Sequence, residues 1–225
     1  MSSVDLTPRC PAHCQPVRKH GSYTKSRRTA RQRQAGFSLV EVAIVTAIIL
    51  LVAILGIPAI GTYVIENKVP KVGEALQRFA IRTKANAQGG GETPYAGVST
   101  VALAHAVSES SVFDVSGTGS RRVVIHGLGG SGQGSNGVVT VAPVAVGGSG
   151  MGSGFALTLS NVSHAACPAL ASLMQGVATR MTLNSATGGL LLMDRDATPP
   201  VPYRAAHAAS QCSQGDKNTF VFTVR

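Results

Sequence analysis

The chain of 225 residues has no tryptophan, and four tyrosines and six phenylalanines are its only aromatic residues. A hydrophobic core must therefore be filled mainly by aliphatic side chains. Acidic residues are also scarce, with ten Asp and Glu against twenty Lys and Arg. Such sparse carboxylates form no evident calcium cage, and Asp194 and Asp196 are more typical of a turn before Pro199 and Pro200.

Motifs of nucleotide-binding and catalytic sites are missing as well. Two glycine-rich segments, 127–137 and 147–154, have no lysine after the glycines, which excludes a phosphate-binding loop. No serine lies in the G-x-S-x-G turn of hydrolases, and residues 92–225 offer no convergent nucleophile, base or metal set. We therefore expect neither an enzyme nor a cofactor, and we interpret both glycine-rich segments as mobile surface loops.

Cysteine and histidine do not follow a metal-binding pattern. The spacing of the N-terminal set is irregular for zinc: Cys10, His13, Cys14 and His20. The other histidines are scattered along the chain: His105, His126, His164 and His207. We expect these four at the surface or at helix caps, and we predict no metal site.

One long apolar run, from Phe37 to Ile60, dominates the N-terminal quarter. Its 24 residues extend about 36 Å as a helix, against a hydrocarbon core of about 30 Å in a bilayer. The run contains a single carboxylate, Glu41, which costs roughly 2.5–3.5 kcal/mol at the centre of a membrane helix and less near its end. The sequence therefore predicts a membrane span, and the cost of placing Glu41 in it indicates that this acid has a specific role.

Positive charge is concentrated ahead of this run. Residues 1–36 carry eight Lys and Arg and one Asp, a net of +7, whereas residues 37–225 carry twelve basic and nine acidic residues, a net of +3. Basic flanks stay in the cytoplasm, so residues after Ile60 are expected on the far side of the membrane. Nucleic-acid binding is not favoured, because Tyr23 is the only aromatic residue in the basic segment.

The run is too long for an ordinary secretory signal, whose apolar core has about 7–15 residues and ends at a small-residue cleavage site. Here the small residue, Gly36, precedes the run. The sequence Gly36-Phe37-Ser38-Leu39-Val40-Glu41, followed by the apolar run and Pro58, resembles the class III signal of type IV prepilins. The resemblance implies that a prepilin peptidase cuts after Gly36 and N-methylates Phe37, leaving the whole apolar helix on the mature protein.

The resemblance also assigns roles within the helix. In a filament, the new α-amino group of Phe37 is expected to pair with Glu41 of a neighbouring subunit and to fix the register between copies. Pro58, beside the weak helix former Gly56, removes a backbone donor, so the helix is expected to kink or melt there.

Beyond the run, apolar residues continue at helical spacing to about Ala87, with a stripe of Val72, Ala75, Leu76, Phe79 and Ala80. We expect an α+β fold, the type IV pilin fold, in which a long N-terminal α-helical stem packs on an antiparallel β-sheet head. Short helices are predicted at 99–108 and 167–179. Strands are predicted at 122–126, 138–146, 155–162, 181–183, 190–193 and 219–224.

This scheme divides the chain into a cleaved leader (1–36), a long helix (37–87, with 37–60 in membrane or filament core) and a globular head (88–225). Cys10 and Cys14 leave with the leader, so Cys167 and Cys212 are the pair expected to oxidise in an exported head. The resemblance makes residues 167–212 the D-region, the disulfide-framed loop of pilins.

The long leader, the 189-residue mature chain and the closing pattern from Gln211 to Phe222 resemble the type IVb subclass, and in particular the PilS-type pilins of conjugative pili. The leading hypothesis is a major pilin, whose pilus serves conjugation, adhesion or motility. Its expected partners are other copies of the chain, prepilin peptidase, the assembly platform and ATPase machinery, and the inner membrane before assembly into an extracellular pilus. A minor pilin or type II secretion pseudopilin is the alternative, and a membrane-anchored binding domain or enzyme is a third.

Overall fold

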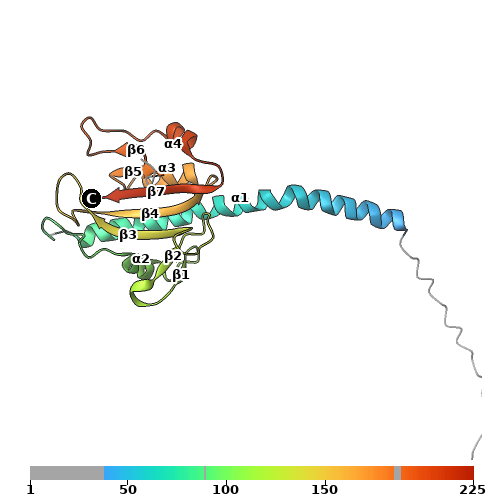
Figure 1. Cartoon of the computed structure of the whole chain (residues 1–225), viewed down its shortest axis with the longest axis horizontal. Helices are drawn as coiled ribbons and strands as arrows, with labels where there is room; N and C mark the ends of the chain where they lie inside the picture. Colours follow the sequence, from blue (N-terminus) through green and yellow to red (C-terminus); the bar gives the residue numbers. More distant parts are fainter. Residues whose placement is uncertain (1–37, 89, 185–188) are drawn as a thin grey trace, which may run out of the picture. The chain divides into compact units, whose positions relative to one another are not determined.

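The structure is a computed structural model that describes residues 38–88, 90–184 and 189–225. The chain consists of two units, residues 1–46 and residues 47–225. Helix α1 (Leu39–Asn86) begins in the first unit and continues into the second, which contains the sheet and the other helices (Figure 1). The predicted leader, residues 1–36, lies outside the described residues.

Seven antiparallel strands form one sheet in the order β1-β2-β3-β4-β7-β5-β6. Their bounds are β1 (Asp114–Ser116), β2 (Val123–Ile125), β3 (Val138–Val144), β4 (Gly154–Ser163), β5 (Arg180–Leu183), β6 (Leu190–Asp194) and β7 (Asp216–Val224). The C-terminal strand β7 lies between β4 and β5, so it joins the two halves of the sheet (Figure 1).

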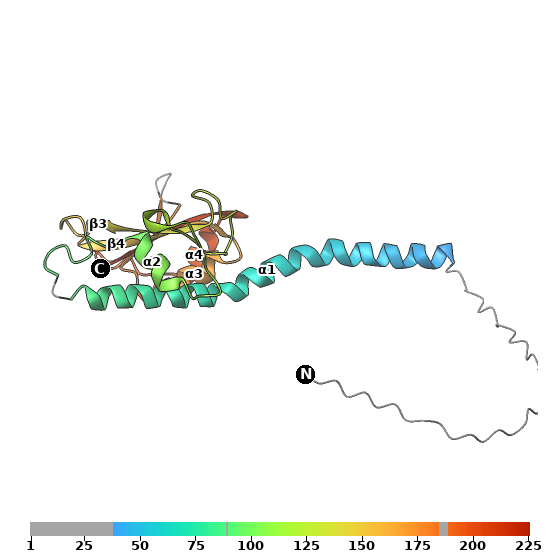
Figure 2. The same cartoon turned by 90° about the horizontal axis from the view of Figure 1, so that it is seen from below.

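The second half of α1 packs on the sheet through the predicted apolar stripe. Val72, Leu76, Phe79 and Ala80 are buried, and Ala75 is partly buried against the same core. Phe79 meets the Phe155 ring of β4 edge to face, with ring centroids 6.2 Å apart. Figure 2 shows this half of α1 running along one face of the sheet, beside α2 and α3.

Apolar side chains at every second position of β4 and β7 form the other side of this core. Phe220, Phe222 and Val224 of β7 are fully buried, and they stand opposite Leu159, Leu157 and Phe155 of β4. A period of two places all six side chains on the face that α1 covers, as expected for a sheet with one buried face. The core is mainly aliphatic, as the lack of aromatic residues requires.

Three short helices and one 3-10 turn complete the second unit: α2 (Thr100–Val107), η1 (Gly119–Arg121), α3 (Cys167–Met174) and α4 (Ala205–Gln211). The Thr100 hydroxyl oxygen accepts a hydrogen bond from the Val141 N–H of β3 at 2.9 Å, which fixes the start of α2 against the sheet. Gly73 of α1 lies so close to α3 that an added Cβ would be 2.8 Å from Leu173.

The predicted α+β fold is confirmed, with a long N-terminal helix and an antiparallel sheet. In the head, the predicted boundaries that differ by two residues or more are the ends of α3 (Met174 rather than 179) and β3 (Val144 rather than 146) and the start of β7 (Asp216 rather than 219). The prediction missed β1, η1 and α4. Helix α1 is continuous over Leu39–Asn86 in the single copy, and the kink or local melting expected at Gly56 and Pro58 remains a prediction.

The two glycine-rich segments lie largely at the surface, as predicted, and each is also held by specific contacts. In the first, Leu128 is fully buried, and its carbonyl oxygen accepts the Ser163 N–H at 2.8 Å. In the second, the Gly152 carbonyl oxygen accepts the Tyr95 N–H at 2.9 Å. The glycines permit the close backbone approach that these contacts require.

Gly129→Ala is expected to destabilise the head by about 1–3 kcal/mol. Gly129 has a φ of +137°, and an added Cβ would lie 2.7 Å from the Asn161 carbonyl oxygen and the Ser163 nitrogen. Thermal unfolding of the detergent-solubilised chain measures the effect. Gly97→Ala is the matched control, because an added Cβ there meets nothing within 4 Å; equal losses in both variants would contradict the assigned role of Gly129.

Candidate assembly segment and disulfide-framed region

The first half of α1 presents an unbroken apolar surface. Every Val, Leu and Ile side chain from Leu39 to Ile60 is at least 49% exposed. Helix α1 is long and apolar enough to cross a membrane, by length and composition, and its most apolar 18-residue window has a mean hydropathy of 2.9. So large an apolar surface requires a nonaqueous neighbour, either lipid or other protein copies.

Glu41 lies in the first turn of α1 and is exposed. It is the only acidic or basic side chain from Leu39 to Ile65. A negative charge is favoured at this end of a helix by the helix dipole. Among the described residues, no cation lies within ion-pair distance of the Glu41 carboxylate. The acid is thus placed to receive a positive group from outside the described chain.

The other polar group near the start of the helix, Thr46, is satisfied internally. Its hydroxyl donates to the backbone carbonyl of Val42 at 2.9 Å or of Ala43 at 3.0 Å. A hydroxyl bonded within its own helix suits an apolar environment. Thr46 therefore needs no partner from another molecule, in contrast to Glu41.

The remaining predicted site residues of the N-terminal region are Gly36, Phe37, Gly56 and Pro58. Gly36 and Phe37, the predicted cleavage and methylation positions, lie outside the described residues. Gly56 is helical, and an added Cβ there would meet nothing within 4 Å in a single copy. Pro58 also lies within the helical span. The predicted effect of Gly56 and Pro58 on the helix remains a prediction.

A disulfide joins Cys167 to Cys212, as predicted, with a Cα–Cα distance of 6.0 Å. Cys167 is the first residue of α3 and is fully buried, whereas Cys212 follows α4 and is half-buried. The bond therefore ties the start of α3 to the end of α4. The sequence offered a signal for α4 that we missed, an alanine-rich segment shortly after Pro202.

The segment spanned by the disulfide, with a sequence separation of 45, contributes strands β5 and β6 to the sheet. Strand β5 pairs with β7 on one side and with β6 on the other. In the adjoining connections, the Ser172 and Tyr203 hydroxyl oxygens lie 3.0 Å apart, which links α3 to the segment before α4. Residues 185–188, between β5 and β6, are outside the described residues.

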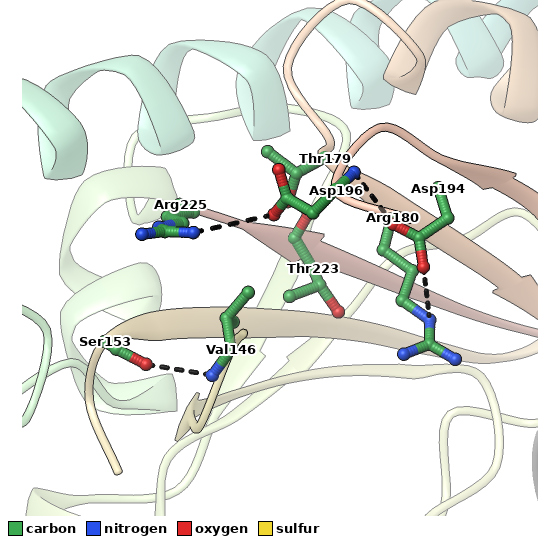
Figure 3. Close-up of polar contacts among 8 residues, drawn as sticks. All are labelled: Val146, Ser153, Thr179, Arg180, Asp194, Asp196, Thr223 and Arg225. Carbon is green, nitrogen blue, oxygen red and sulfur yellow. Dashed lines mark hydrogen bonds and ion pairs between the residues drawn. The ribbon is translucent and has the colours of Figure 1, made fainter. Parts of the chain in front are cut away.

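Charged side chains connect this region to the C-terminal end of the sheet (Figure 3). Arg180 of β5 lies 3.6 Å from the Asp194 carboxylate of β6, and the Arg225 guanidinium lies 3.9 Å from Asp196. Asp194 ends strand β6 rather than lying in a turn as predicted, and Asp196 lies in the bend after it, where its N–H donates to the Asp194 carboxylate at 3.0 Å. Such partly exposed pairs contribute about 0–1 kcal/mol each, so they orient the turn more than they stabilise it.

The position of His126 in the structure differs from the one predicted from the sequence. We predicted a surface or capping role, but its side chain is fully buried beneath the first glycine-rich segment. Nothing in its sequence context distinguishes it from the other histidines. Among the described residues, no group of three or more His, Cys, Asp or Glu gathers as metal ligands. The Cys10–His20 set lies outside the described residues.

In comparisons with known proteins, two family models match the N-terminal and the C-terminal part of the chain. Residues 31–57 match the family model of the prokaryotic N-terminal methylation motif, and residues 134–225 match the family model described as PilS N terminal. No curated protein matches the chain. A crystal structure of type IV b pilin from Salmonella typhi is 21% identical, with a TM-score of 0.45, over 68% of this chain and 97% of that one.

The two family matches fall on the features already described. The methylation-motif match includes Gly36, Phe37 and Glu41, and the PilS match includes both disulfide cysteines and the five strands β3 to β7. Pilins are structural filament subunits, which accords with an exposed apolar helix joined to a disulfide-containing head. The two family matches, over residues 31–57 and 134–225, together support the interpretation of the chain as a type IVb prepilin.

Proposed function

We propose that the chain is the major subunit of a type IVb pilus, polymerised through its N-terminal helix after prepilin peptidase removes residues 1–36. The observation that carries the proposal is the apolar surface of α1 from Leu39 to Ile60, with Glu41 as its one charge. In this proposal Gly36 is the last leader residue and Phe37 is the first, N-methylated residue of the mature subunit, and both positions lie inside the methylation-motif match.

Before assembly, the apolar helix anchors the subunit in the inner membrane. The net charge of +7 on residues 1–36 supports a cytoplasmic leader and a head on the periplasmic side. The chain then consists of three segments: the leader (1–36), the long helix (37–87) and the head (88–225). The head contains the D-region (167–212). The assembly platform and its ATPase are the machinery that extracts such a subunit from the membrane.

After assembly, residues 37–60 of many copies form the filament core. Cleavage creates an α-amino group on Phe37, and a neighbouring copy shifted along the axis places this amine against Glu41. An ion pair is much stronger in such a low-dielectric core than in water, and it is satisfied at one relative shift of the two helices. Gly56 and Pro58 then weaken one stretch of the helix, which allows it to adjust to its neighbours.

A minor pilin or type II secretion pseudopilin shares the same N-terminal features and is the alternative function. The long leader favours a type IVb major subunit, since pseudopilins usually have short leaders. Electron microscopy of cells that carry a labelled head distinguishes the two: label along the whole filament supports a major subunit, and label at the tip alone supports a minor one.

Gly36→Ala is expected to block processing, because the resemblance places the cleaved bond directly after this glycine. The measurement is the mass of the chain recovered from membranes, which should retain residues 1–36. Gly56→Ala is the control, since Gly56 lies within α1 and has open space around it. A Gly36→Ala chain that still begins at Phe37 would refute the cleavage assignment.

A further inference from the structure

The buried imidazole of His126 connects strand β4 to the glycine-rich segment 127–137, here called the glycine loop. Its Nε2 lies 2.8 Å from the Ser160 carbonyl oxygen, and its Nδ1 lies 3.0 Å from the Leu128 N–H. A carbonyl can only accept and an N–H can only donate, so Nε2 carries the proton and Nδ1 is the acceptor. Both bonds are therefore made by neutral histidine.

The glycine loop continues from this contact as a hydrogen-bonded unit. The Gly130 N–H donates to the Asp216 carboxylate of β7 at 2.9 Å, and the Ser131 N–H donates to the Asn136 side chain at 2.9 Å. At the end of the loop, the Val138 N–H donates to the Ser160 hydroxyl at 3.1 Å. The bonds to Asp216 and Ser160 require the loop to lie against β7 and β4, whereas the Ser131–Asn136 bond holds the loop together internally.

Protonation of His126 is incompatible with this arrangement. A proton on Nδ1 faces the Leu128 N–H, so that hydrogen bond is lost, and a charge is created at a fully buried position. Burial lowers the pKa of His126, while its hydrogen bond to the Ser160 carbonyl and the Asp216 carboxylate act in the opposite direction. The folded loop therefore favours the neutral form.

Few other charges face this histidine from the surrounding elements. Asp216 lies at the start of β7, the Lys68 ammonium of α1 lies close to Gly127, and Asp114 of β1 stands opposite Ile125 in the sheet. Strands β3 and β4 contribute no charged residue. Of these groups, the Asp216 carboxylate favours the protonated form of His126.

We propose that His126 is a proton-operated latch for the glycine loop: neutral histidine holds residues 127–137 against β4 and β7, and protonated histidine releases them. The head then presents two surfaces, one with the loop closed near neutral pH and one with the loop open in acid. The sign follows from the bonds: unfolding or release of the loop raises the affinity of His126 for a proton, so acid favours release.

Hydrogen–deuterium exchange of the full chain in detergent micelles tests the proposal. The labelling time at each pH is adjusted for the pH dependence of intrinsic amide exchange. Peptides covering 127–138 are followed from pH 7.5 to pH 4.0. The amides of Leu128 and Gly130 are expected to exchange at least tenfold faster at the acid end, while those of the β4–β7 pair stay protected. Unchanged protection of the loop across this range overturns the proposal.

Two variants identify the group that titrates. His126→Gln has no proton to gain, so the pH dependence of loop exchange is expected to disappear, whatever its level of protection. Asp216→Asn keeps an oxygen that accepts from Gly130 but removes the charge that favours protonated His126, so the midpoint of release is expected to move to lower pH. If the pH dependence of loop exchange survives in His126→Gln, or disappears in Asp216→Asn, the proposal is overturned.

His164 provides the matched control. It is a partly buried histidine in the same part of the head, where its backbone N–H donates to the Gly215 carbonyl at 2.9 Å. His164→Gln is expected to leave both the midpoint and the size of the exchange change within twofold of the unmodified chain. A loss of the pH dependence in this variant would assign the response to His164 and overturn the role of His126.

Discussion

Glu41→Ala is expected to abolish pilus filaments while the chain is still made, processed and folded. The carboxylate is the only charge in the exposed apolar part of α1, and no described cation pairs with it in a single copy. Its proposed partner is the Phe37 amine of a neighbouring copy. Without the carboxylate, that amine must be buried in the filament core unpaired, which costs about 3–5 kcal/mol for each subunit contact.

The measurement for Glu41→Ala is the number of filaments per cell by electron microscopy, with the mass of the mature chain as the check on processing. Glu66→Ala is the matched control, because Glu66 is an exposed acid on the same helix beyond the apolar run. We expect normal filaments from this control. Abundant normal filaments from Glu41→Ala would contradict the register role.

Replacing both disulfide cysteines by serine, in Cys167→Ser/Cys212→Ser, has the second largest expected effect. The disulfide spans 45 residues that contain α3, β5, β6 and α4. In the chain-entropy description, releasing a loop of this length lowers the free energy of unfolding by roughly 4 kcal/mol. Because β5 pairs directly with β7, loosening this region also weakens the pairing at the centre of the sheet.

Urea unfolding of the detergent-solubilised chain measures this loss. Cys10→Ser/Cys14→Ser is the control, since both residues belong to the proposed leader and lie outside the head. Thiol labelling should find Cys167 and Cys212 unreactive until a reductant is added. Unchanged stability of the Cys167→Ser/Cys212→Ser head would show that its packing, rather than the disulfide, holds the D-region in place.

The sequence was sufficient to predict the features that depend on periodicity. The spacing of Val72, Leu76 and Phe79 predicted which face of α1 is buried, because a helix can satisfy that pattern in one way against a sheet. The strands β4 and β7 were predicted from their alternation, and the disulfide followed from the resemblance to pilins and the exported head. These signals are local, so no knowledge of the tertiary structure was needed.

Features that depend on contacts between distant segments were not predictable. His126 is fully buried and meets Ser160 of the distant strand β4, a contact that no residue near position 126 indicates in the sequence. Gly129 similarly depends on the backbone of Asn161 and Ser163. Strand β1 has only three residues and exists through its pairing with β2, so its sequence carries too little pattern to be recognised.

Helical reconstruction of the filament by electron cryo-microscopy would show directly whether the apolar helices form the filament core. We expect residues 37–60 of neighbouring copies to pack together along the filament axis, with the Phe37 nitrogen within ion-pair distance of Glu41 in an adjacent copy. A filament whose contacts are made by the heads alone, with the apolar helices apart or with residues 1–36 still attached, would contradict this expectation.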